Sequence, residues 1–229
     1  MTFKLTLALE PQVSGREIPI NYQYELSAII YRIIANADAS YSEMLHDKGF
    51  SSTKKHFKLF TFSNLIVPNY GIDKERERLI IKSDKVYMYI SFQPEKDVQQ
   101  FIQGIFAQQS FRIYDELSET EFVIQEVQVM PPLEYNVEDI FQTLSPVCIS
   151  LRNDRGYMDY LCPDHSLYET GLLTGLLARY KVITGEEYEG EIYCHLKLLS
   201  EPKSALISIK SGKINGTRVR GFRYKFQID

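Results

Sequence analysis

The chain is poor in the residues that usually reveal a cofactor or a covalent mechanism. It has no tryptophan, three cysteines and four histidines among 229 residues. Cys148, Cys162 and Cys194 form no Cys-x-x-Cys pair, and this odd number indicates a reducing compartment rather than a disulfide framework or a structural zinc site. No two histidines have metal-ligand spacing with a carboxylate nearby, so we predict no catalytic metal and no cofactor.

Several kinds of segment are also missing. No G-x-S-x-G, P-loop or G-x-G-x-x-G segment is present, which argues against the hydrolases and nucleotide-binding proteins that those motifs mark. The chain has no apolar run of about 18 residues and no basic start followed by an apolar stretch, so we predict a cytoplasmic protein with no membrane partner. A net charge of −4 does not by itself indicate a nucleic-acid partner, so the distribution of the charge matters more.

The first half of the chain alternates between two hydrophobic periods. Period-two alternation predicts strands, a period near 3.6 predicts helices, and Ser83-Asp84-Lys85 is typical of a tight hairpin between two of the strands. The predicted strands cover residues 3–9, 57–65, 78–82, 86–92, 111–114 and 121–130. The first predicted helix begins at residue 21, and two further predicted helices cover residues 39–47 and 94–107. This order is that of a ferredoxin-like unit.

The second half has a similar order of elements without a sequence repeat. We predict a strand region at 140–151, a helix at about 165–183 that ends before Gly185, and strands at 190–200, 203–210 and 214–228. Residues 130–134 are the best linker. The predicted fold class is therefore α+β, with two tandem ferredoxin-like (RRM-like) units of antiparallel sheet, at residues 1–130 and 131–229.

Basic charge is segregated at two places. Residues 203–228 contain seven basic residues and no acidic one, and residues 48–62 are also free of acid. The basic residues are Lys203, Lys210, Lys213, Arg218, Arg220, Arg223 and Lys225 in the first segment, and Lys48, Lys54, Lys55 and Lys58 in the second. Arg218 and Arg220 would share one face of a strand. The distribution favours binding of a polyanion along both segments, and the alternative is a solvated hairpin whose charges deter edge pairing.

Two residues of the first half lie off the apolar stripes of their helices. Tyr31 lies roughly 130° from the centre of the stripe in the first helix, and His46 has a similar relation to Tyr41, Met44 and Leu45. His46 also lies in the last turn before Gly49, where the helix dipole favours a cation. An imidazole there is suited to general acid or base catalysis, although such a histidine can equally be a simple surface residue.

The other three histidines are weaker candidates. His56 lies in a lysine run and is either a phosphate contact or without function. His165 follows Pro163-Asp164 and suits the start of a helix, and His195 lies in an apolar strand, where packing or pairing is the simpler interpretation. His46 therefore remains the best candidate for proton transfer.

A set of ordered markers along the whole chain resembles one family. The markers are the Tyr24-to-Tyr31 helix, Leu45-His46, the segment Lys58-Leu59-Phe60-Thr61-Phe62-Ser63, Thr143-Leu144-Ser145-Pro146, and Arg220-Gly221-Phe222. With them the chain resembles the CRISPR-associated endoribonucleases that cut the repeat–spacer transcript within each repeat. The resemblance implies metal-independent cleavage by the 2′-hydroxyl of the RNA, with a 2′,3′-cyclic phosphate and a 5′-hydroxyl as products.

The resemblance also implies roles for particular residues. Tyr31 would position the 2′-hydroxyl, His46 would transfer a proton, as an acid or as a base, and Lys58 would stabilise the phosphorane. Lys54 and Lys55 are alternative sources of that positive charge, because the interval between His46 and Lys58 holds an additional loop. The expected RNA-binding residues are Lys54, Lys55, Lys203, Lys210, Lys213, Arg218, Arg220, Gly221, Phe222 and Arg223.

Two other interpretations stay open at this point. A non-cleaving RNA-binding subunit of a CRISPR ribonucleoprotein complex would keep the basic segments without requiring Tyr31, His46 and Lys58 to converge. A protein-interaction module would leave both basic segments unexplained. The expected partner is CRISPR repeat RNA, with a homodimer and association with other effector-complex subunits as further alternatives.

Overall fold

The structure, a computed structural model, divides into two compact units. It describes residues 1–9, 15–52, 55–93, 95–136, 138–192, 194–208 and 218–228. Unit 1 comprises residues 1–50 and 58–132, and unit 2 comprises residues 51–57 and 133–229. The short segment 51–57, with β3 (Phe50–Ser52) and β4 (Lys55–Phe57) paired in a two-stranded sheet, therefore clusters mainly with the second half of the chain.

Unit 1 is built on a five-stranded antiparallel sheet with the strand order β5–β8–β1–β10–β9. The strands are β1 (Thr2–Leu9), β5 (Phe60–Phe62), β8 (Lys85–Phe92), β9 (Ser110–Tyr114) and β10 (Glu119–Val129). β1 is central and pairs with β8 on one side and β10 on the other. Its alternating residues Phe3, Leu5 and Leu7 are at most 2% exposed, so the period-two pattern of the sequence places them in the core.

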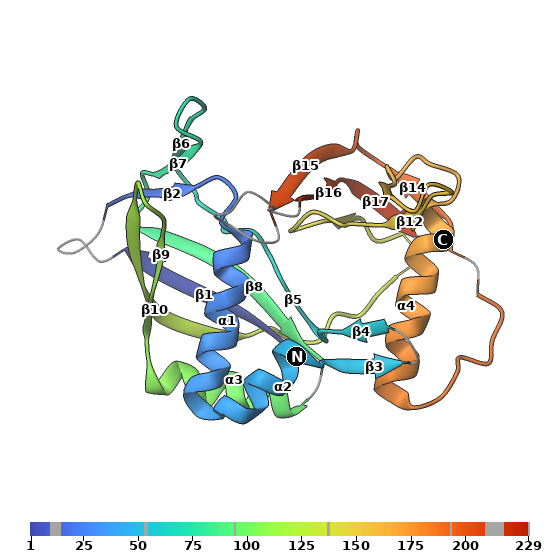
Figure 1. The fold of residues 1–229 in the computed structure, drawn as a ribbon, viewed down its shortest axis with the longest axis horizontal. Helices are drawn as coiled ribbons and strands as arrows, with labels where there is room; N and C mark the ends of the chain where they lie inside the picture. Colours follow the sequence, from blue (N-terminus) through green and yellow to red (C-terminus); the bar gives the residue numbers. More distant parts are fainter. Residues whose placement is uncertain are drawn as a thin grey trace. The chain divides into compact units, whose positions relative to one another are not determined.

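Three helices complete unit 1, namely α1 (Gln23–Ala37), α2 (Ala39–Asp47) and α3 (Glu95–Ala107). The predicted apolar stripe of α1 is confirmed, because its buried residues are Leu26, Ile29, Ile30, Ile33 and Ile34. They belong to the same core cluster as the inward side chains of the sheet, and α1 crosses in front of that sheet in Figure 1.

α1 and α3 approach each other closely at Gly104. A Cβ added to this residue would lie 1.7 Å from the carbonyl oxygen of Ile33, so only glycine permits the contact. Among the helices and the strands of the main sheet, the order is strand, two helices, two strands, helix and two strands, which agrees with the order predicted for a ferredoxin-like unit.

One predicted hairpin of unit 1 is wrong. β7 (Arg78–Ile81) does not pair with β8 across residues 82–84, but forms a separate three-stranded sheet with β2 (Glu17–Pro19) and β6 (Tyr70–Asp73). The tight turn lies instead at residues 74–77, where the Asp73 carboxylate accepts hydrogen bonds from the backbone N–H groups of Glu75 and Arg76. These bonds turn the chain back onto β6, and β8 is free to pair with β1.

Unit 2 has shorter strands and a smaller core. Its strands form three small antiparallel sheets besides the β3–β4 pair, and α4 (Tyr168–Thr184) is the one helix among its described residues. The strands are β11 (Phe141–Gln142), β12 (Ser150–Arg152), β13 (Met158–Tyr160), β14 (Leu196–Leu198), β15 (Lys203–Ser208), β16 (Arg218–Arg223) and β17 (Lys225–Ile228).

The helix predicted at residues 165–183 is α4, and it ends as expected at Gly185, whose φ of 80° is in the left-handed region. In the core of unit 2, the hydroxyls of Tyr168 and Tyr224 form a hydrogen bond of 2.9 Å. The α+β class with antiparallel sheets is confirmed.

Candidate active site

α2 presents His46 at its last turn. The helix begins at Asp38, whose carboxylate accepts a hydrogen bond of 2.9 Å from the backbone N–H of Tyr41. It ends before Gly49, which has a φ of 59° and donates its N–H to the Met44 carbonyl, as the sequence predicted. Tyr41 and Leu45 are buried, whereas the His46 side chain is 65% exposed, so the imidazole faces solvent on a helix anchored by its neighbours.

α1 places Tyr31 beside that histidine. Tyr31 lies outside the buried stripe of α1 and is half-buried against the core cluster. Its carbonyl oxygen accepts a hydrogen bond of 2.8 Å from the Ser42 hydroxyl of α2, which ties the two helices together at this level. The Tyr31 and His46 rings meet edge to face with their centroids 5.1 Å apart.

Lys58 joins the same cluster from the segment between β4 and β5. The predicted continuous strand 57–65 is interrupted here, and Lys58 turns its side chain to the end of α2. Its ammonium donates hydrogen bonds to the carbonyl oxygens of Leu45 and His46, two acceptors in the last turn of the helix. Lys58 therefore holds the helix end that carries the imidazole.

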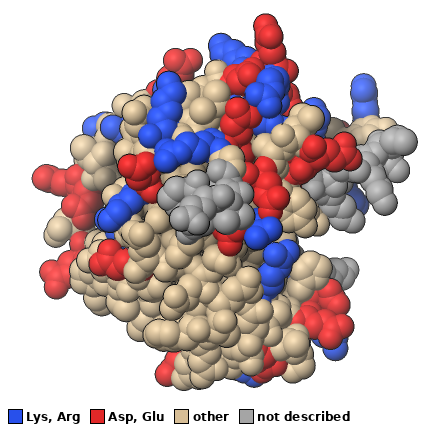
Figure 2. All heavy atoms as spheres, turned by 90° about the vertical axis from the view of Figure 1, so that its left-hand side faces the viewer, with Lys and Arg blue, Asp and Glu red and all other residues tan. Residues whose placement is uncertain are grey.

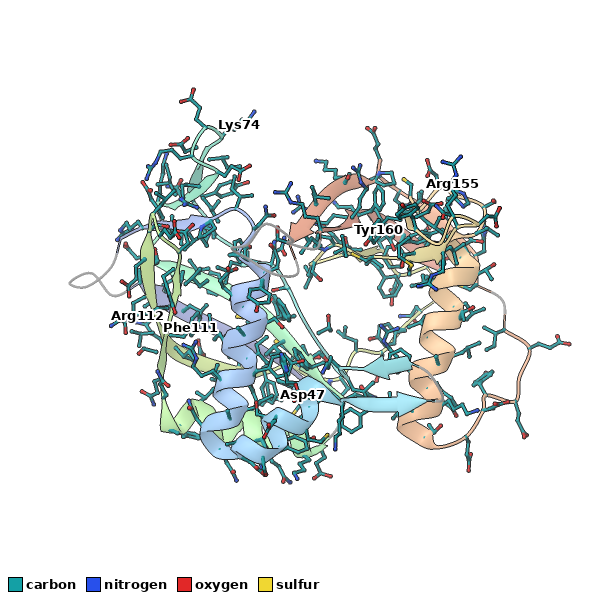
Figure 3. The ribbon with its side chains drawn as sticks, viewed as in Figure 1. Asp47, Lys74, Phe111, Arg112, Arg155 and Tyr160 are labelled. Atoms are coloured by element: carbon teal, nitrogen blue, oxygen red, sulfur yellow. The ribbon has the colours of Figure 1, made fainter. Side chains whose placement is uncertain are left out.

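The three residues singled out in the sequence are thus brought together within unit 1. The Lys58 Nζ atom lies 5.8 Å from the centroid of the Tyr31 ring, and the Phe60 ring packs edge-on against Tyr31 at 5.5 Å. Figure 3 labels Asp47, which follows His46 at the end of α2. The cluster contains a phenol, an imidazole and an ammonium, which can orient a hydroxyl, move a proton and stabilise an anion.

The surroundings of Tyr31, Lys58 and His46 act on these three side chains in different ways. Burial, assisted by the negative charge of Asp97, raises the pKa of Tyr31 to about 12, so its phenol stays protonated at neutral pH. Burial lowers the pKa of Lys58, and the nearby Asp47 carboxylate opposes that change. The His46 Nδ1 atom lies 2.7 Å from Asp47 Oδ1, so Asp47 engages one ring nitrogen and leaves Nε2 for another partner.

Sequence reasoning missed a buried pair behind the cluster. Asp97 of α3 is 0% exposed, and its carboxylate accepts a hydrogen bond from the Tyr41 hydroxyl of α2. Burial raises the pKa of Asp97, while the Tyr41 bond and Lys96 act in the opposite direction. An acidic residue in the first turn of a helix is ordinary in a sequence, so no pattern distinguished Asp97 from a surface residue.

Unit 2 carries the second candidate surface on the β15–β16 hairpin. Arg218 and Arg220 are both exposed and Val219 between them is half-buried, so the two arginines share one face as predicted. Lys203 and Arg223 are exposed and occupy opposed positions in the pairing of the two strands. Arg220 Nη1 donates a hydrogen bond of 3.4 Å to the Ser204 hydroxyl, which leaves most of the guanidinium available to a ligand.

Gly221 and Phe222 have a different environment from the arginines around them. Phe222 is 7% exposed and belongs to the core cluster of unit 2, so its ring is not available to stack on a base. A Cβ on Gly221 would lie 2.8 Å from both the Cys148 Sγ and the Pro146 Cβ atoms, so glycine is required here by packing. The Phe222 ring therefore packs in the core of unit 2, and the RNA-binding role expected of Gly221 and Phe222 stays a prediction.

Some of the predicted RNA-binding residues fall outside the described part of the structure. Lys54, Lys210 and Lys213 lie outside the described residues, as does the side chain of Lys55. In the described ranges, no group of three or more His, Cys, Asp or Glu residues has the arrangement of a metal site. No helix within those ranges is long and apolar enough to cross a membrane.

Two family models match consecutive parts of the chain. A model described as CRISPR-associated protein Cas6, N-terminal, matches residues 17–128. A model described as CRISPR associated protein Cas6, C-terminal, matches residues 129–229. The two matches follow each other without a gap, and each bears on one half of the chain.

Curated proteins from two archaea are similar in sequence. The chain is 29% identical over 174 residues to CRISPR-associated endoribonuclease Cas6 1 of Methanocaldococcus jannaschii, a match that covers 74% of this chain and 63% of that protein. It is 25% identical over 159 residues to CRISPR-associated endoribonuclease Cas6 of Pyrococcus furiosus, over 69% of this chain and 56% of that protein. Each match spans less than two thirds of the relative's own length.

Solved structures share the fold. A RAMP protein described as binding different RNA substrates superposes with a TM-score of 0.80 at 22% identity, over 100% of this chain and 87% of the other. A CRISPR associated protein Cas6 superposes with a TM-score of 0.72 at 24% identity, over 100% and 88% of the two chains. At these identities the similarity bears on the fold alone.

Proposed function

Because the chain belongs to the Cas6 family of CRISPR-associated proteins, we propose that it is a metal-independent endoribonuclease that cleaves CRISPR precursor RNA within the repeat. The observation that carries the proposal is the convergence of Tyr31, His46 and Lys58 in unit 1. The relatives named CRISPR-associated endoribonuclease support the same reaction class.

The proposed reaction is an internal transfer of the phosphodiester. The 2′-oxygen forms a bond to phosphorus, the bond from phosphorus to the 5′-oxygen breaks, and one proton leaves the 2′-oxygen while another reaches the 5′-oxygen. The products are a 2′,3′-cyclic phosphate and a 5′-hydroxyl. The proposed reaction consumes no water and no cofactor. The protein therefore needs only to orient the reacting groups, transfer protons and stabilise the negative charge that develops on the phosphorane.

His46 is the proposed proton-transfer group. Asp47 accepts a hydrogen bond from the Nδ1–H group, and Nε2 then carries either a lone pair or a proton, according to the charge of the ring. The exposed imidazole can therefore serve as a base for the 2′-hydroxyl or as an acid for the 5′-oxygen. The hydrogen bonds from Lys58 to the carbonyl oxygens of Leu45 and His46 hold this group in place.

Tyr31 is proposed to orient the 2′-hydroxyl as a neutral phenol. With a pKa of about 12, it does not lose its proton near neutral pH and is unsuited to act as the base. A protonated phenol can both donate to and accept from a ribose hydroxyl. Its position edge-on to the His46 ring favours a substrate oxygen that both groups reach.

Lys58 is proposed to stabilise the charge that develops on the phosphorane. A lysine ammonium has three N–H donors, and two of them bind the helix carbonyls, so the third remains for a phosphate oxygen. Lys54 and Lys55 stay as alternatives for this charge. The exposed Lys203, Arg218, Arg220 and Arg223 are proposed to hold the RNA backbone, with Lys210 and Lys213 of the same acid-free segment.

Cleavage of labelled repeat RNA in EDTA tests the chemistry. His46→Ala should slow cleavage about 10²–10⁴-fold, the usual contribution of a general acid or base, while RNA binding is retained. His195→Ala is the matched control, because His195 is also exposed, at 71%, and also lies beside a carboxylate, that of Glu169. Undiminished cleavage by His46→Ala would remove the assignment, and loss of wild-type cleavage in EDTA would overturn the metal-free mechanism.

A substrate with sulfur in place of the 5′-bridging oxygen separates the two possible roles of His46. A thiolate leaves without a proton, so this substrate should restore cleavage by His46→Ala if the imidazole is the acid. No restoration would assign His46 as the base. A wild-type protein that binds repeat RNA tightly and cuts neither substrate would instead favour a non-cleaving RNA-binding subunit.

A further inference from the structure

Hydrogen bonds from three directions hold α2, the helix that carries the imidazole. Lys58 donates to the carbonyl oxygens of its last turn. The Ser42 hydroxyl donates to the carbonyl oxygen of Tyr31 in α1. The third bond joins the Tyr41 hydroxyl to the Asp97 carboxylate of α3. Lys58 and Tyr31 belong to the proposed mechanism, whereas the bond from Tyr41 to Asp97 is not yet explained by it.

The Asp97 carboxylate lies in a costly place. On the face of the molecule that Figure 2 shows, acidic side chains stand at the surface beside basic ones, which is the usual position of a carboxylate. Asp97 is instead 0% exposed, and its buried Oδ2 atom accepts no hydrogen bond from any described residue. Replacement of such a buried polar pair by apolar groups of the same shape is often neutral or stabilising. Stability of the core therefore does not account for this bond.

The bond restrains the rotation of a short helix. α2 has only nine residues, and its buried Leu45 packs through apolar contacts, which have no preferred direction. Hydrogen bonds do have a preferred direction. Neighbouring residues of a helix point about 100° apart, so the bonds from Tyr41 and Ser42 oppose rotation about the helix axis from two sides. Such a rotation would move His46 out of its contact with Tyr31, where the ring centroids are 5.1 Å apart.

We propose that Asp97 is a positioning residue, which acts through the Tyr41 hydroxyl to fix the rotation of α2 and thereby the place of His46. This role rests on the proposed function, because it concerns the same reaction. Asp97 accepts its hydrogen bond behind α2 and does not touch the reacting atoms. Its carboxylate serves as a hydrogen-bond acceptor for Tyr41, so the oxygen of an amide can take its place.

Single-turnover cleavage of labelled repeat RNA tests the positioning role. Tyr41→Phe and Asp97→Leu should each lower the rate at saturating RNA by about 10–100-fold, because a displacement near 1 Å can cost about 10²-fold. The RNA concentration that gives half of the maximal rate should not change, because neither residue binds RNA. Asp97→Asn keeps an oxygen that accepts from the Tyr41 hydroxyl, so it should cleave at nearly the wild-type rate.

Tyr22→Phe is the matched control for the loss of a buried hydroxyl. Tyr22 is 5% exposed in the same core cluster, and its hydroxyl accepts a hydrogen bond of 2.9 Å from the backbone N–H of Leu65. Its removal should leave the cleavage rate at saturating RNA unchanged. An equal loss of cleavage in Tyr22→Phe and Tyr41→Phe would overturn the proposal.

The double variant Tyr41→Phe with Asp97→Leu separates position from stability. It replaces the bonded pair by two apolar side chains of similar shape, so it should melt no lower than the wild type. Its cleavage should nevertheless stay as slow as that of either single variant, because all three lack the same bond. Wild-type cleavage by the double variant would overturn the proposal, and so would an Asp97→Asn protein as slow as Asp97→Leu.

The same assay distinguishes failure of this inference from failure of the proposed function. A wild-type protein that does not cleave repeat RNA would overturn the proposed function and this inference with it. A wild type that cleaves, that loses cleavage on His46→Ala and that is unaffected by Tyr41→Phe would overturn this inference alone.

Discussion

Unit 1 and unit 2 differ in the size of their hydrophobic cores. Over the described residues, the core cluster of unit 1 contains 27 buried apolar side chains and that of unit 2 contains five. Unit 1 rests on a five-stranded sheet, whereas the sheets of unit 2 have two or three strands. The proposed chemistry lies in the well-packed unit, where side chains can be held in position, and the exposed arginines lie on a small hairpin of the other.

The two units also differ in whether their charged side chains are buried or exposed. The charged residues that the structure buries among the described ranges, Arg78 and Asp97, are both in unit 1. Arg78 is paired with Asp115 at 2.7 Å, and Asp97 accepts a hydrogen bond from Tyr41. In unit 2, the acid-free segment places its arginines in solvent. In unit 1, the buried charged side chains fix the positions of the partners that they bind. In unit 2, the exposed arginines are available to a polyanion.

The largest expected effect concerns the core of unit 1. Phe101 is 0% exposed, and its ring lies 4.8 Å from Phe92 and 6.0 Å from Phe3. Phe101→Ala should lower the free energy of unfolding by about 3–5 kcal/mol, because it leaves a cavity in a close-packed cluster. Urea unfolding measures the loss, and hydrogen exchange of β1 and β8 should accelerate. Leu161→Ala is the corresponding substitution in the core of unit 2. If Phe101→Ala accelerated hydrogen exchange equally in both units, the result would show that the two units unfold together.

An intermediate effect concerns the basic face of β16. Arg218→Ala combined with Arg220→Ala should weaken RNA binding and reduce the slope of log K against log salt by about 2, one for each phosphate that the variant no longer neutralises. Filter binding at several salt concentrations gives this slope. Arg152→Ala with Arg155→Ala, two exposed arginines of the same unit outside the acid-free segment, is the matched control. An equal loss of affinity in the control would assign the effect to net charge alone.

The smallest expected effect concerns Asp97. Because burial raises its pKa in the folded state, the stability linked to Asp97 is fully present below the unfolded pKa of about 3.9 and is lost as pH rises through the folded pKa. Asp97→Asn does not titrate, so the variant should gain stability relative to wild type between about pH 4 and neutrality. Melting temperatures at several pH values test this, with Asp154→Asn of unit 2 as an exposed control. A difference that is constant with pH would contradict it.

Much of unit 1 could be predicted because the signals are local. The stripe of α1 and the end of α2 at Gly49 follow from residues within a few positions of one another. The pairing of β7 with β2 could not be predicted from local residues, because β2 is some 60 positions away in the chain. Burial of Phe222 was missed for the same reason, since a basic segment gives no sign that one of its aromatic residues faces a core.

The sequence by itself determined the periodicity of the main helices and strands, the segregation of basic charge, and the positions of Tyr31 and His46 off their apolar stripes. Only the tertiary structure decided that Lys58 binds the last carbonyls of α2 and that Asp97 is buried against Tyr41. The physical reason is that periodicity specifies which face of an element is apolar, whereas hydrogen bonds between elements depend on which elements meet.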